Sequence, residues 1–317
     1  MRAPLPSLRQ LAYLVELSDR LNFHAAAQAQ FVTQSTLSAA IKELESLLGV
    51  QLVERDKRTV RLTEVGKTVT DRARDLLAEA GDLVEAARSG AEPLSGSCRF
   101  GAIPTIAPFL LPQVLPLLRE QHESLKLYLR EDFTDRLLER LHAGDLDIAL
   151  IALPYATGEL YVRELFRDAF HFVAYEGHPL LRASRIDVRK VDTQDVLLLE
   201  EGHCLREHAI QACGDRRATW KAKVEASSLY TLLQMVEGRL GVTLLPQVAL
   251  DAGLMRNTRL AARPFTAPAP ARTLALVARR TSARHREVDL LAEAILAQRA
   301  AVVTQGRKRA SAHRASS

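Results

Sequence analysis

The chain has 317 residues, 47% of them hydrophobic, which is enough for two or three domains with cores of their own. Three cysteines exclude a disulfide-rich scaffold and favour a reducing compartment, so we expect a cytoplasmic protein. No apolar run approaches a membrane span, and Arg9 and Glu16 interrupt any signal-peptide pattern. Five Lys and Arg residues between Arg299 and Ser317 account for the whole net charge of +5. Bulk charge is therefore no argument for DNA binding.

The first 62 residues predict a winged helix-turn-helix domain. Apolar residues at helical spacing indicate a helix around Leu8–Val15, and an alanine-rich helix follows over Phe23–Gln30. A third helix is expected from about Gln34 to Leu48, where Gly49 ends it. The segment Gln51–Leu62 resembles two short strands around a basic turn, which suits a wing against a DNA backbone.

The N-terminal face of the third helix carries short polar side chains suited to base edges and phosphates of double-stranded DNA. The alternative is an ordinary three-helix bundle with a solvated charged turn. The predicted contacts are, to bases, Gln34, Ser35, Thr36 and Ser38 and, to phosphates, Lys42, Arg55, Lys57 and Arg58.

Residues 63–97 are expected to form a linker helix followed by a hinge. A helix from Thr63 to about Ser89 carries apolar residues spaced as in a coiled coil. These residues are Val65, Val69, Ala73, Leu76, Ala80, Leu83 and Ala87. A helix packed on its own domain can show the same stripe, but we expect a homodimer through this seam. The Gly-, Pro- and Ser-rich residues 90–97 then act as the hinge.

Residues 98–303 alternate strands and helices, which predicts an α/β effector domain of two doubly wound lobes. Lobe I comprises about 98–165 and 267–303, and lobe II about 166–266. The expected strands are Arg99–Ile103, Leu125–Leu129, Asp147–Leu153, Phe170–Tyr175, Val196–Leu199, Lys223–Ala226, Gly241–Leu245 and Thr273–Arg279. A closing helix is expected to end near Arg299, and the basic tail 304–317 to be disordered. The cleft between the lobes is the expected sensing site.

The stretch from Gly202 to Cys213 follows a predicted strand and a turn. Cys204 would begin a helix beside His203 and Arg206, and such cations lower a cysteine pKa. On one regular helix Cys204 and Cys213 would lie roughly 14 Å apart on opposite faces. A disulfide needs Cα atoms within about 7 Å, so pairing would require that helix to come apart.

Three interpretations of this stretch stay open on its residues alone. The cysteines can be ordinary core residues, because cysteine often behaves as a small hydrophobe. They can be a redox pair, or Cys204 and His208 can belong to a metal site. The spacing fits no standard zinc pattern.

Five segments near the N-terminus form a recognisable pattern: residues 25–27, 32–38, 41–45, 48–55 and 63–66. They resemble the signature of the LysR-type transcriptional regulators, except that Ser35 stands where the common version has proline. The resemblance implies a winged helix-turn-helix domain, a linker helix that dimerises, and an effector domain like periplasmic binding proteins.

Further segments match the OxyR subgroup of this family, whose members sense hydrogen peroxide. These are residues 103–105, 202–206, 227–229 and 241–246, together with Thr134 and Cys213. The resemblance implies that Cys204 is the peroxidatic thiol, that Cys213 resolves it in a disulfide, and that Thr105 handles the peroxide. The expected peroxide-binding residues are Thr105, Thr134, His203, Arg206, Ser228 and Arg272. Cys98 matches nothing functional.

The protein so implied is an activator of the oxidative-stress response and not an enzyme. Its partners are double-stranded DNA, hydrogen peroxide, RNA polymerase and further copies of the chain in a dimer of dimers. No metal, cofactor or membrane is expected. Two alternatives remain: a LysR-type regulator that binds a small anion in the cleft, and a thiol-dependent peroxidase or metal enzyme with an added DNA-binding domain.

Overall fold

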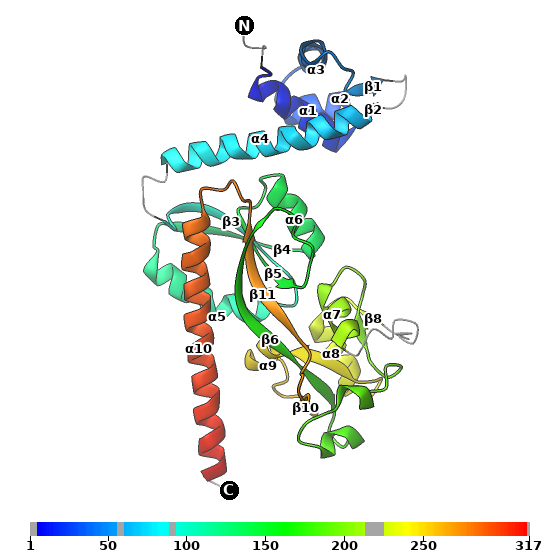
Figure 1. Ribbon diagram of the computed structural model, residues 1–317, viewed down its shortest axis with the longest axis vertical. Coiled ribbons are helices and arrows are strands. Elements are labelled where there is room, and N and C mark those ends of the chain that lie inside the picture. Colours follow the sequence, from blue (N-terminus) through cyan, green and yellow to red (C-terminus); the bar gives the residue numbers. More distant parts are fainter. Residues whose placement is uncertain (1–4, 56–59, 89–92, 213–224, 316–317) are drawn as a thin grey trace. The chain divides into compact units, whose positions relative to one another are not determined.

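The computed structural model describes residues 5–55, 60–88, 93–212 and 225–315, except the side chains of residues 55, 82, 85–88, 212, 303 and 305–315 (Figure 1). The chain divides into two compact units. One is Met1–Ala91 with the short segment His142–Asp145, and the other is Glu92–Leu141 with Leu146–Ser317.

The N-terminal unit begins with the three predicted helices, α1 (Leu8–Arg20), α2 (Phe23–Ala29) and α3 (Gln34–Leu48). Each helix starts at a side chain that accepts a backbone N–H of its first turn: Ser7, Asn22 and Thr33 in turn. Gly49 ends α3 with φ of 70°, a conformation that glycine adopts without strain. The helices enclose a small core centred on fully buried leucine and isoleucine side chains of α1 and α3.

The wing follows as β1 (Val53–Arg55) and β2 (Val60–Leu62), which pair antiparallel. The Glu45 carboxylate of α3 accepts the backbone N–H groups of Leu52 and Val53 at 2.9 and 3.0 Å. These two bonds fasten the first strand to α3. The predicted winged helix-turn-helix fold is therefore confirmed.

The linker helix α4 runs from Glu64 to Arg88, and its predicted apolar seam has two uses. Val69 and Ala73 pack into the core of the unit itself. Leu76 and Leu83, about one and about three turns further along, are 49% and 72% exposed. The stripe is therefore partly a packing face for its own domain, and the two leucines further along it are exposed.

The second unit is built on a seven-stranded mixed sheet with strand order β10-β6-β11-β5-β3-β4, in which β9 also pairs with β6. The strands are β3 (Gly96–Ala102), β4 (Leu125–Glu131), β5 (Ile148–Leu153), β6 (Tyr161–Tyr175), β9 (Thr243–Pro246), β10 (Leu260–Pro264) and β11 (Ala271–Ala278), and β7 (Leu198–Leu199) pairs separately with β8 (Glu225–Ala226). The helices are α5 (Ala107–Gln121), α6 (Thr134–His142), α7 (Cys204–Ala212), α8 (Leu229–Glu237), α9 (Gln247–Asp251) and α10 (His285–Ala315), with short 3-10 turns at Pro179–Arg182 and Val188–Lys190.

The predicted two lobes are confirmed, and each has its own hydrophobic core. In lobe I, β4, β3 and β5 are parallel, and β11 returns antiparallel beside β5, as expected. The 15-residue strand β6 pairs with β11 in its first part and with β9 and β10 in its second. Because β6 serves both lobes, the sheet is mixed and continuous (Figure 1) rather than two separate doubly wound sheets.

One prediction about the C-terminus is wrong. The closing helix does not end near Arg299, and residues 304–315 are not disordered, because α10 continues to Ala315. Alanine, lysine and arginine favour helix, and Gly306 alone opposes it in this segment.

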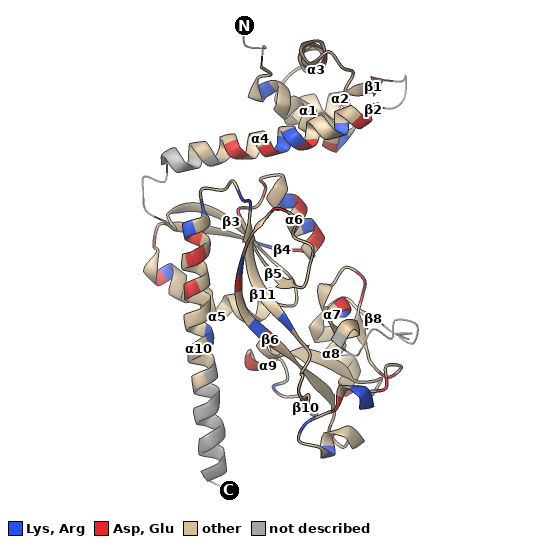
Figure 2. Ribbon diagram, viewed as in Figure 1, with Lys and Arg blue, Asp and Glu red and all other residues tan. Residues whose placement is uncertain are grey.

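Charge is mixed over the rest of the chain. Figure 2 shows positive and negative residues alternating along α4 and over α6. In the described part of the chain, no helix is long and apolar enough to cross a membrane.

The exposed half of the α4 seam generates a first prediction. Replacing Leu76 or Leu83 with Asp would place a charge where we expect a second copy of α4 to pack, and a buried unpaired charge is costly. Each variant should weaken dimerisation at least tenfold, or about 1.4 kcal/mol, as measured by sedimentation equilibrium.

The matched control is Lys67→Asp, an exposed position on the opposite side of α4. It should leave the monomer–dimer equilibrium unchanged. Full dimerisation of both leucine variants would place the interface on another surface.

Candidate functional site

Cys204 is the first residue of α7 and lies where the two lobes meet. Gly202 precedes it with φ of 98°, and a Cβ there would lie 3.2 Å from the Phe133 ring. The turn therefore favours glycine, and any larger residue would also have to push the Phe133 ring aside by a few tenths of an ångström. The Cys204 side chain belongs to the core of lobe I, whereas Leu205 and Ala209 belong to the core of lobe II. Helix α7 thus joins the two cores.

Cys204 is 8% exposed, and the pKa of its thiol is raised because burial disfavours the thiolate. Arg272, the Thr134 hydroxyl and the backbone N–H groups of residues 204 and 205 act in the opposite direction. The expectation of a lowered pKa is therefore wrong for this state of the molecule. The cation that acts on the thiol is Arg272, rather than the sequence neighbours His203 and Arg206.

Arg272 of β11 is fully buried and bound on three sides. Its Nε donates to Asp168 Oδ2 of β6 at 3.0 Å. Its two Nη atoms donate to the hydroxyl and the carbonyl oxygen of Thr105, at 2.8 and 3.0 Å. Because the Thr105 hydroxyl oxygen accepts from a cation, its proton remains able to bind another acceptor.

Thr134 begins α6 and is 2% exposed. Its hydroxyl oxygen makes no hydrogen bond to a nitrogen or oxygen of the described residues and faces the Cys204 thiol instead. A buried hydroxyl without such a partner costs about 1–3 kcal/mol. Exceptions of this kind are rare and often mark a functional role.

His203 lies immediately before α7. Its Nε2 is 3.1 Å from the Ser227 carbonyl oxygen. Its ring lies edge-on to the Phe133 ring, with the two ring centroids 4.7 Å apart. Burial lowers its pKa, so the neutral ring is favoured. Its Nδ1 is buried and has no hydrogen-bond partner within the described residues.

Two other predicted peroxide-binding residues are placed differently. Arg206 donates to the Leu199 carbonyl oxygen at 3.0 Å and to Glu225 at 2.6 Å, so it fastens α7 to β7 and β8. Ser228 caps α8, where its Oγ accepts the backbone N–H of Thr231 at 3.2 Å. Arg206 is thus committed to holding α7, whereas Ser228 faces the cleft.

A cavity of about 370 Å³ opens between the lobes beside this site. Thr105, His203 and Ser228 line it. The cavity lining does not include the other predicted site residues of the effector domain that the structure describes, which are Thr134, Cys204, Arg206 and Arg272. The other lining residues are Pro104, Pro108, Phe109, Glu131, Asp132, Phe133, Arg136, Ser227, Leu229 and Tyr230.

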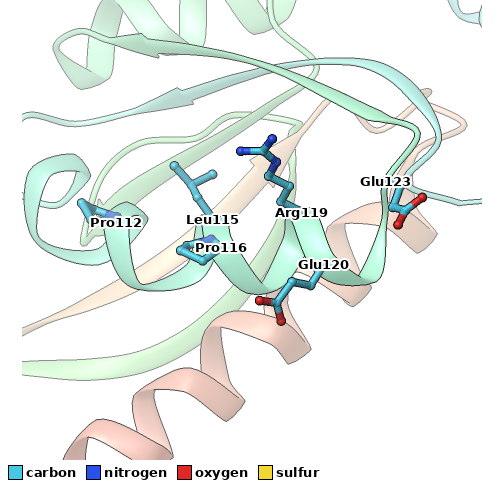
Figure 3. Close-up of a pocket in the computed structure, with 6 residues that line it drawn as sticks. All are labelled: Pro112, Leu115, Pro116, Arg119, Glu120 and Glu123. Carbon is cyan, nitrogen blue, oxygen red and sulfur yellow. The ribbon is translucent and has the colours of Figure 1, made fainter.

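A second hollow lies on lobe I and contains none of the predicted site residues. Figure 3 shows its lining, which comes from α5 and the residues just after it. These residues are Pro112, Leu115, Pro116, Arg119, Glu120 and Glu123.

Cys98 of β3 is fully buried within a different polar network. Burial and the nearby Asp147 and Glu287 carboxylates raise its pKa to about 12, although Arg284 and Arg99 oppose them. Its thiolate is therefore scarce at neutral pH, in keeping with the absence of a predicted role.

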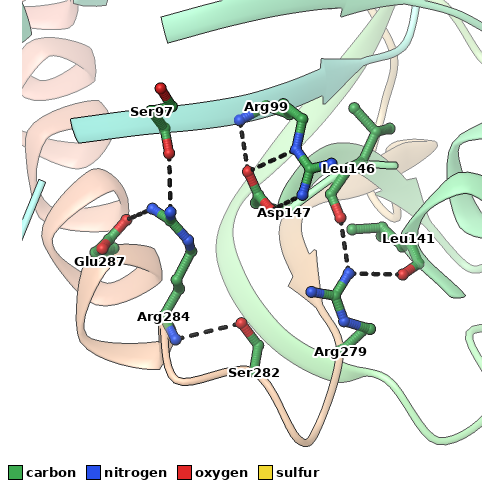
Figure 4. A network of polar contacts seen from close by, with 9 residues as sticks. All are labelled: Ser97, Arg99, Leu141, Leu146, Asp147, Arg279, Ser282, Arg284 and Glu287. Carbon is green, nitrogen blue, oxygen red and sulfur yellow. Dashed lines mark hydrogen bonds and ion pairs between the residues drawn. The ribbon is translucent and has the colours of Figure 1, made fainter. Parts of the chain in front are cut away.

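The network around Cys98 ties the start of the effector domain together (Figure 4). Arg284 donates to Glu287 at 2.7 Å and to the Ser97 carbonyl oxygen at 2.8 Å. Asp147 accepts from Arg99 at 2.7 Å. These bonds join β3 to β5 and α10.

The predicted DNA-contacting face is on the surface of the N-terminal unit. Gln34, Ser35, Thr36 and Lys42 are exposed, and Ser38 is half-buried. Lys57, Arg58 and the Arg55 side chain lie outside the described residues, as does Cys213. No group of three or more His, Cys, Asp or Glu side chains that could hold a metal ion occurs in the part of the chain that the structure describes.

Sequence reasoning did not single out Asp168. It lies directly opposite Arg272 in the pairing of β6 with β11. The two residues are 104 positions apart, so no local pattern connects them.

Comparisons with known proteins show the family of the chain. Residues 8–67 match the family described as "Bacterial regulatory helix-turn-helix protein, lysR family", and residues 91–300 match "LysR substrate binding domain". The HTH-type transcriptional regulator EstR of Acinetobacter baylyi is 45% identical over 294 residues, with 91% of this chain and 96% of EstR covered. The DNA-binding transcriptional dual regulator OxyR of Escherichia coli K12 is 37% identical, with 92% and 95% covered.

Solved OxyR structures are also similar. A full-length cysteine-to-aspartate variant from Pseudomonas aeruginosa is 36% identical with a TM-score of 0.74, covering 92% of this chain and 95% of that one. A cysteine-to-serine variant from Corynebacterium glutamicum with hydrogen peroxide bound is 30% identical with a TM-score of 0.66, covering 98% and 97%. The chain therefore belongs to the LysR family of DNA-binding transcriptional regulators.

Proposed function

We propose that this regulator senses hydrogen peroxide through oxidation of Cys204, followed by a disulfide with Cys213. The observation that carries the proposal is the buried thiol at the start of α7, which Arg272 and the Thr134 hydroxyl both act upon. Similarity to OxyR proteins, one of them solved with hydrogen peroxide bound, supports it.

The chemistry proceeds in two steps. The Cys204 thiolate attacks one peroxide oxygen, the S–O bond forms, the O–O bond breaks, and the departing hydroxide takes a proton to become water. Thr105, His203 and Thr134 hold the two oxygens, and Arg272 stabilises the negative charge. The sulfenic acid then condenses with the Cys213 thiol, which forms the disulfide and releases a second water.

The position of α7 explains how a local bond changes the whole domain. Cys204 leaves the core of lobe I when it pairs, while Leu205 and Ala209 remain attached to lobe II. The helix that joins the lobes must therefore rearrange. We propose that the rearrangement shifts the dimer interfaces and so the spacing of the DNA-binding domains.

The remaining partners follow from the same proposal. The protein acts in the cytoplasm as a dimer, or as a dimer of dimers, on double-stranded DNA. It is an activator that engages RNA polymerase and carries no catalytic cycle of its own. A turnover assay with a thiol reductant would reveal a peroxidase instead.

A second candidate is a regulator that binds a small anionic effector without redox change. Two observations favour it. The cavity of about 370 Å³ has more room than a peroxide molecule needs. EstR, a regulator whose name does not refer to peroxide, is 45% identical to this chain. Peroxide would then leave the DNA footprint unchanged, whereas the first candidate requires it to change.

The first of three predictions here concerns the cysteines. Cys204→Ser should abolish both peroxide consumption and the footprint change, because the nucleophile is gone. Cys213→Ser should still react at Cys204, stop at sulfenic acid and over-oxidise to sulfinic acid more readily. Thiol mass spectrometry with DNA footprinting, before and after stoichiometric peroxide, measures both.

Cys98→Ser is the control and should behave as the unmodified protein. Equal loss of thiol reactivity in the Cys204 and Cys213 variants would argue for a shared metal site. First oxidation at Cys98 would overturn the assignment.

The second prediction separates reactivity from stability at Thr134. Thr134→Val removes a buried hydroxyl that has no nitrogen or oxygen partner, so the free energy of unfolding should stay equal or rise by about 1 kcal/mol. The pKa of Cys204 should rise further and its oxidation should slow, because the thiolate loses a donor. Urea unfolding and stopped-flow oxidation measure the two effects. A variant that is less stable and equally reactive would contradict this role.

The third prediction concerns DNA. Lys42→Ala should weaken binding to all sequences and reduce the slope of log affinity against log salt by about 0.9, as for one lost phosphate contact. Gln34→Ala should instead relax specificity at one base position, with an unchanged slope. Fluorescence anisotropy over a salt series distinguishes the two effects. An unchanged slope in the Lys42 variant would show that Lys42 does not contact a DNA phosphate.

A further inference from the structure

A second buried polar group, His208, lies on the same face of α7 as Cys204. The two residues are four positions apart, a spacing that makes helical side chains neighbours with Cβ atoms about 5–6 Å apart. Helical side chains also lean toward the N-terminus, so the His208 ring leans toward the turn that begins with Cys204. His208 is 5% exposed.

The tautomer of His208 follows from its hydrogen bond. Its Nε2 lies 3.1 Å from the Pro154 carbonyl oxygen, which can only accept. Nε2 therefore carries the proton, and Nδ1 of the neutral ring presents a bare lone pair. This Nδ1 is buried and has no hydrogen-bond partner among the residues described. The site thus holds a desolvated neutral imidazole whose Nδ1 lone pair binds no group among the described residues.

Burial is the main reason that the His208 ring is neutral. Burial lowers its pKa, the Pro154 carbonyl raises it, Arg272 on β11 lowers it and Glu207 on α7 raises it. Tyr155, next to Pro154, is close enough to be influenced by the Cys204 thiolate. The neighbouring strand β7 contributes only Leu198 and Leu199, which carry no charge.

We propose that His208 is the proton acceptor for the Cys204 thiol. The structure shows no hydrogen bond between the Cys204 thiol and Nδ1, so the two side chains approach each other when peroxide enters the site. The thiol proton then passes to Nδ1, and the thiolate attacks the peroxide. As the S–O bond forms and the O–O bond breaks, the imidazolium returns the proton to the departing hydroxide. Thiol and peroxide become sulfenic acid and water, and His208 is unchanged. The inference rests on the proposed peroxide chemistry, and it explains how a thiol whose burial disfavours ionisation reacts at neutral pH.

The test is His208→Gln in the full chain, because glutamine can still donate to the Pro154 carbonyl but cannot hold a proton. The rate constant for Cys204 oxidation is measured from about pH 5 to 9 by mass spectrometry of the Cys204 peptide. The unmodified protein should give a flat profile across neutral pH that falls in acid, once His208 is protonated. The variant should react about 10²-fold more slowly at neutral pH and gain tenfold per pH unit, because preformed thiolate alone reacts.

The matched control is His203→Gln. His203 is also buried, also bonds a carbonyl through Nε2 and also has a partnerless Nδ1, but it precedes α7 and does not share the face of Cys204. This variant should oxidise more slowly and keep the flat profile. If His208→Gln fails to fold by circular dichroism, His208→Asn is measured in its place.

Alkylation of Cys204 by iodoacetamide, followed over the same pH range, separates this inference from the proposed function. If alkylation depends on His208 but peroxide does not oxidise Cys204, the proposed function is wrong and the role of His208 as proton acceptor is supported. Peroxide oxidation with the same flat profile in the His208 variant would overturn the proton acceptor alone.

Discussion

The buried ion pair between Arg272 and Asp168 is the constraint on which the effector domain depends. Both side chains are 0% exposed, and removing two charges from water is expensive. Thr105 and the backbone N–H of Val248 supply the further hydrogen bonds that such a pair needs. These groups come from β11, β6, the segment before α5 and the start of α9, so one cluster holds four parts of the fold. Removing either charge alone would cost roughly 3–5 kcal/mol, because the other would stay buried and unpaired.

The same cluster sets the chemistry of the thiol. Arg272 acts on Cys204 from β11, while Thr134, His203 and His208 present buried polar atoms that have no hydrogen-bond partner among the described residues. Buried polar groups are nearly always paired, and a group of exceptions around one thiol is the pattern expected of a site that binds a small polar molecule. Cys98 offers the contrast. It is also buried, and burial together with two nearby carboxylates raises its pKa to about 12. Burial is shared by the two thiols, and the neighbouring charges distinguish them.

Helix α7 connects this chemistry to the rest of the molecule. It places Cys204 in the core of one lobe and Leu205 and Ala209 in the core of the other. Arg206 holds its outer side to β7 and β8, and the His208–Pro154 bond joins it to the end of β5. A change at Cys204 is therefore felt by both lobes, since the helix has no position that leaves both cores undisturbed.

The sequence by itself determined the local features of this protein. Apolar periodicity and caps such as Thr33 and Gly49 placed the helices of the N-terminal unit, and the alternation of strands and helices predicted the two-lobed effector domain. The turn at Gly202 placed Cys204 at a helix start. These features depend on neighbouring residues, so a linear pattern carries them.

Only the tertiary structure decided which charges meet the thiol. Sequence neighbours suggested His203 and Arg206 as the cations, but His203 is buried in a setting that favours its neutral form and Arg206 is bound to Glu225. The cation is Arg272, which the sequence had offered only as a further candidate, and its partner Asp168 lies 104 positions away. The division of the α4 seam between its own core and the surface likewise required the packed domain. Burial and charge pairing arise between residues that are distant in the chain, so a local sequence pattern cannot predict them.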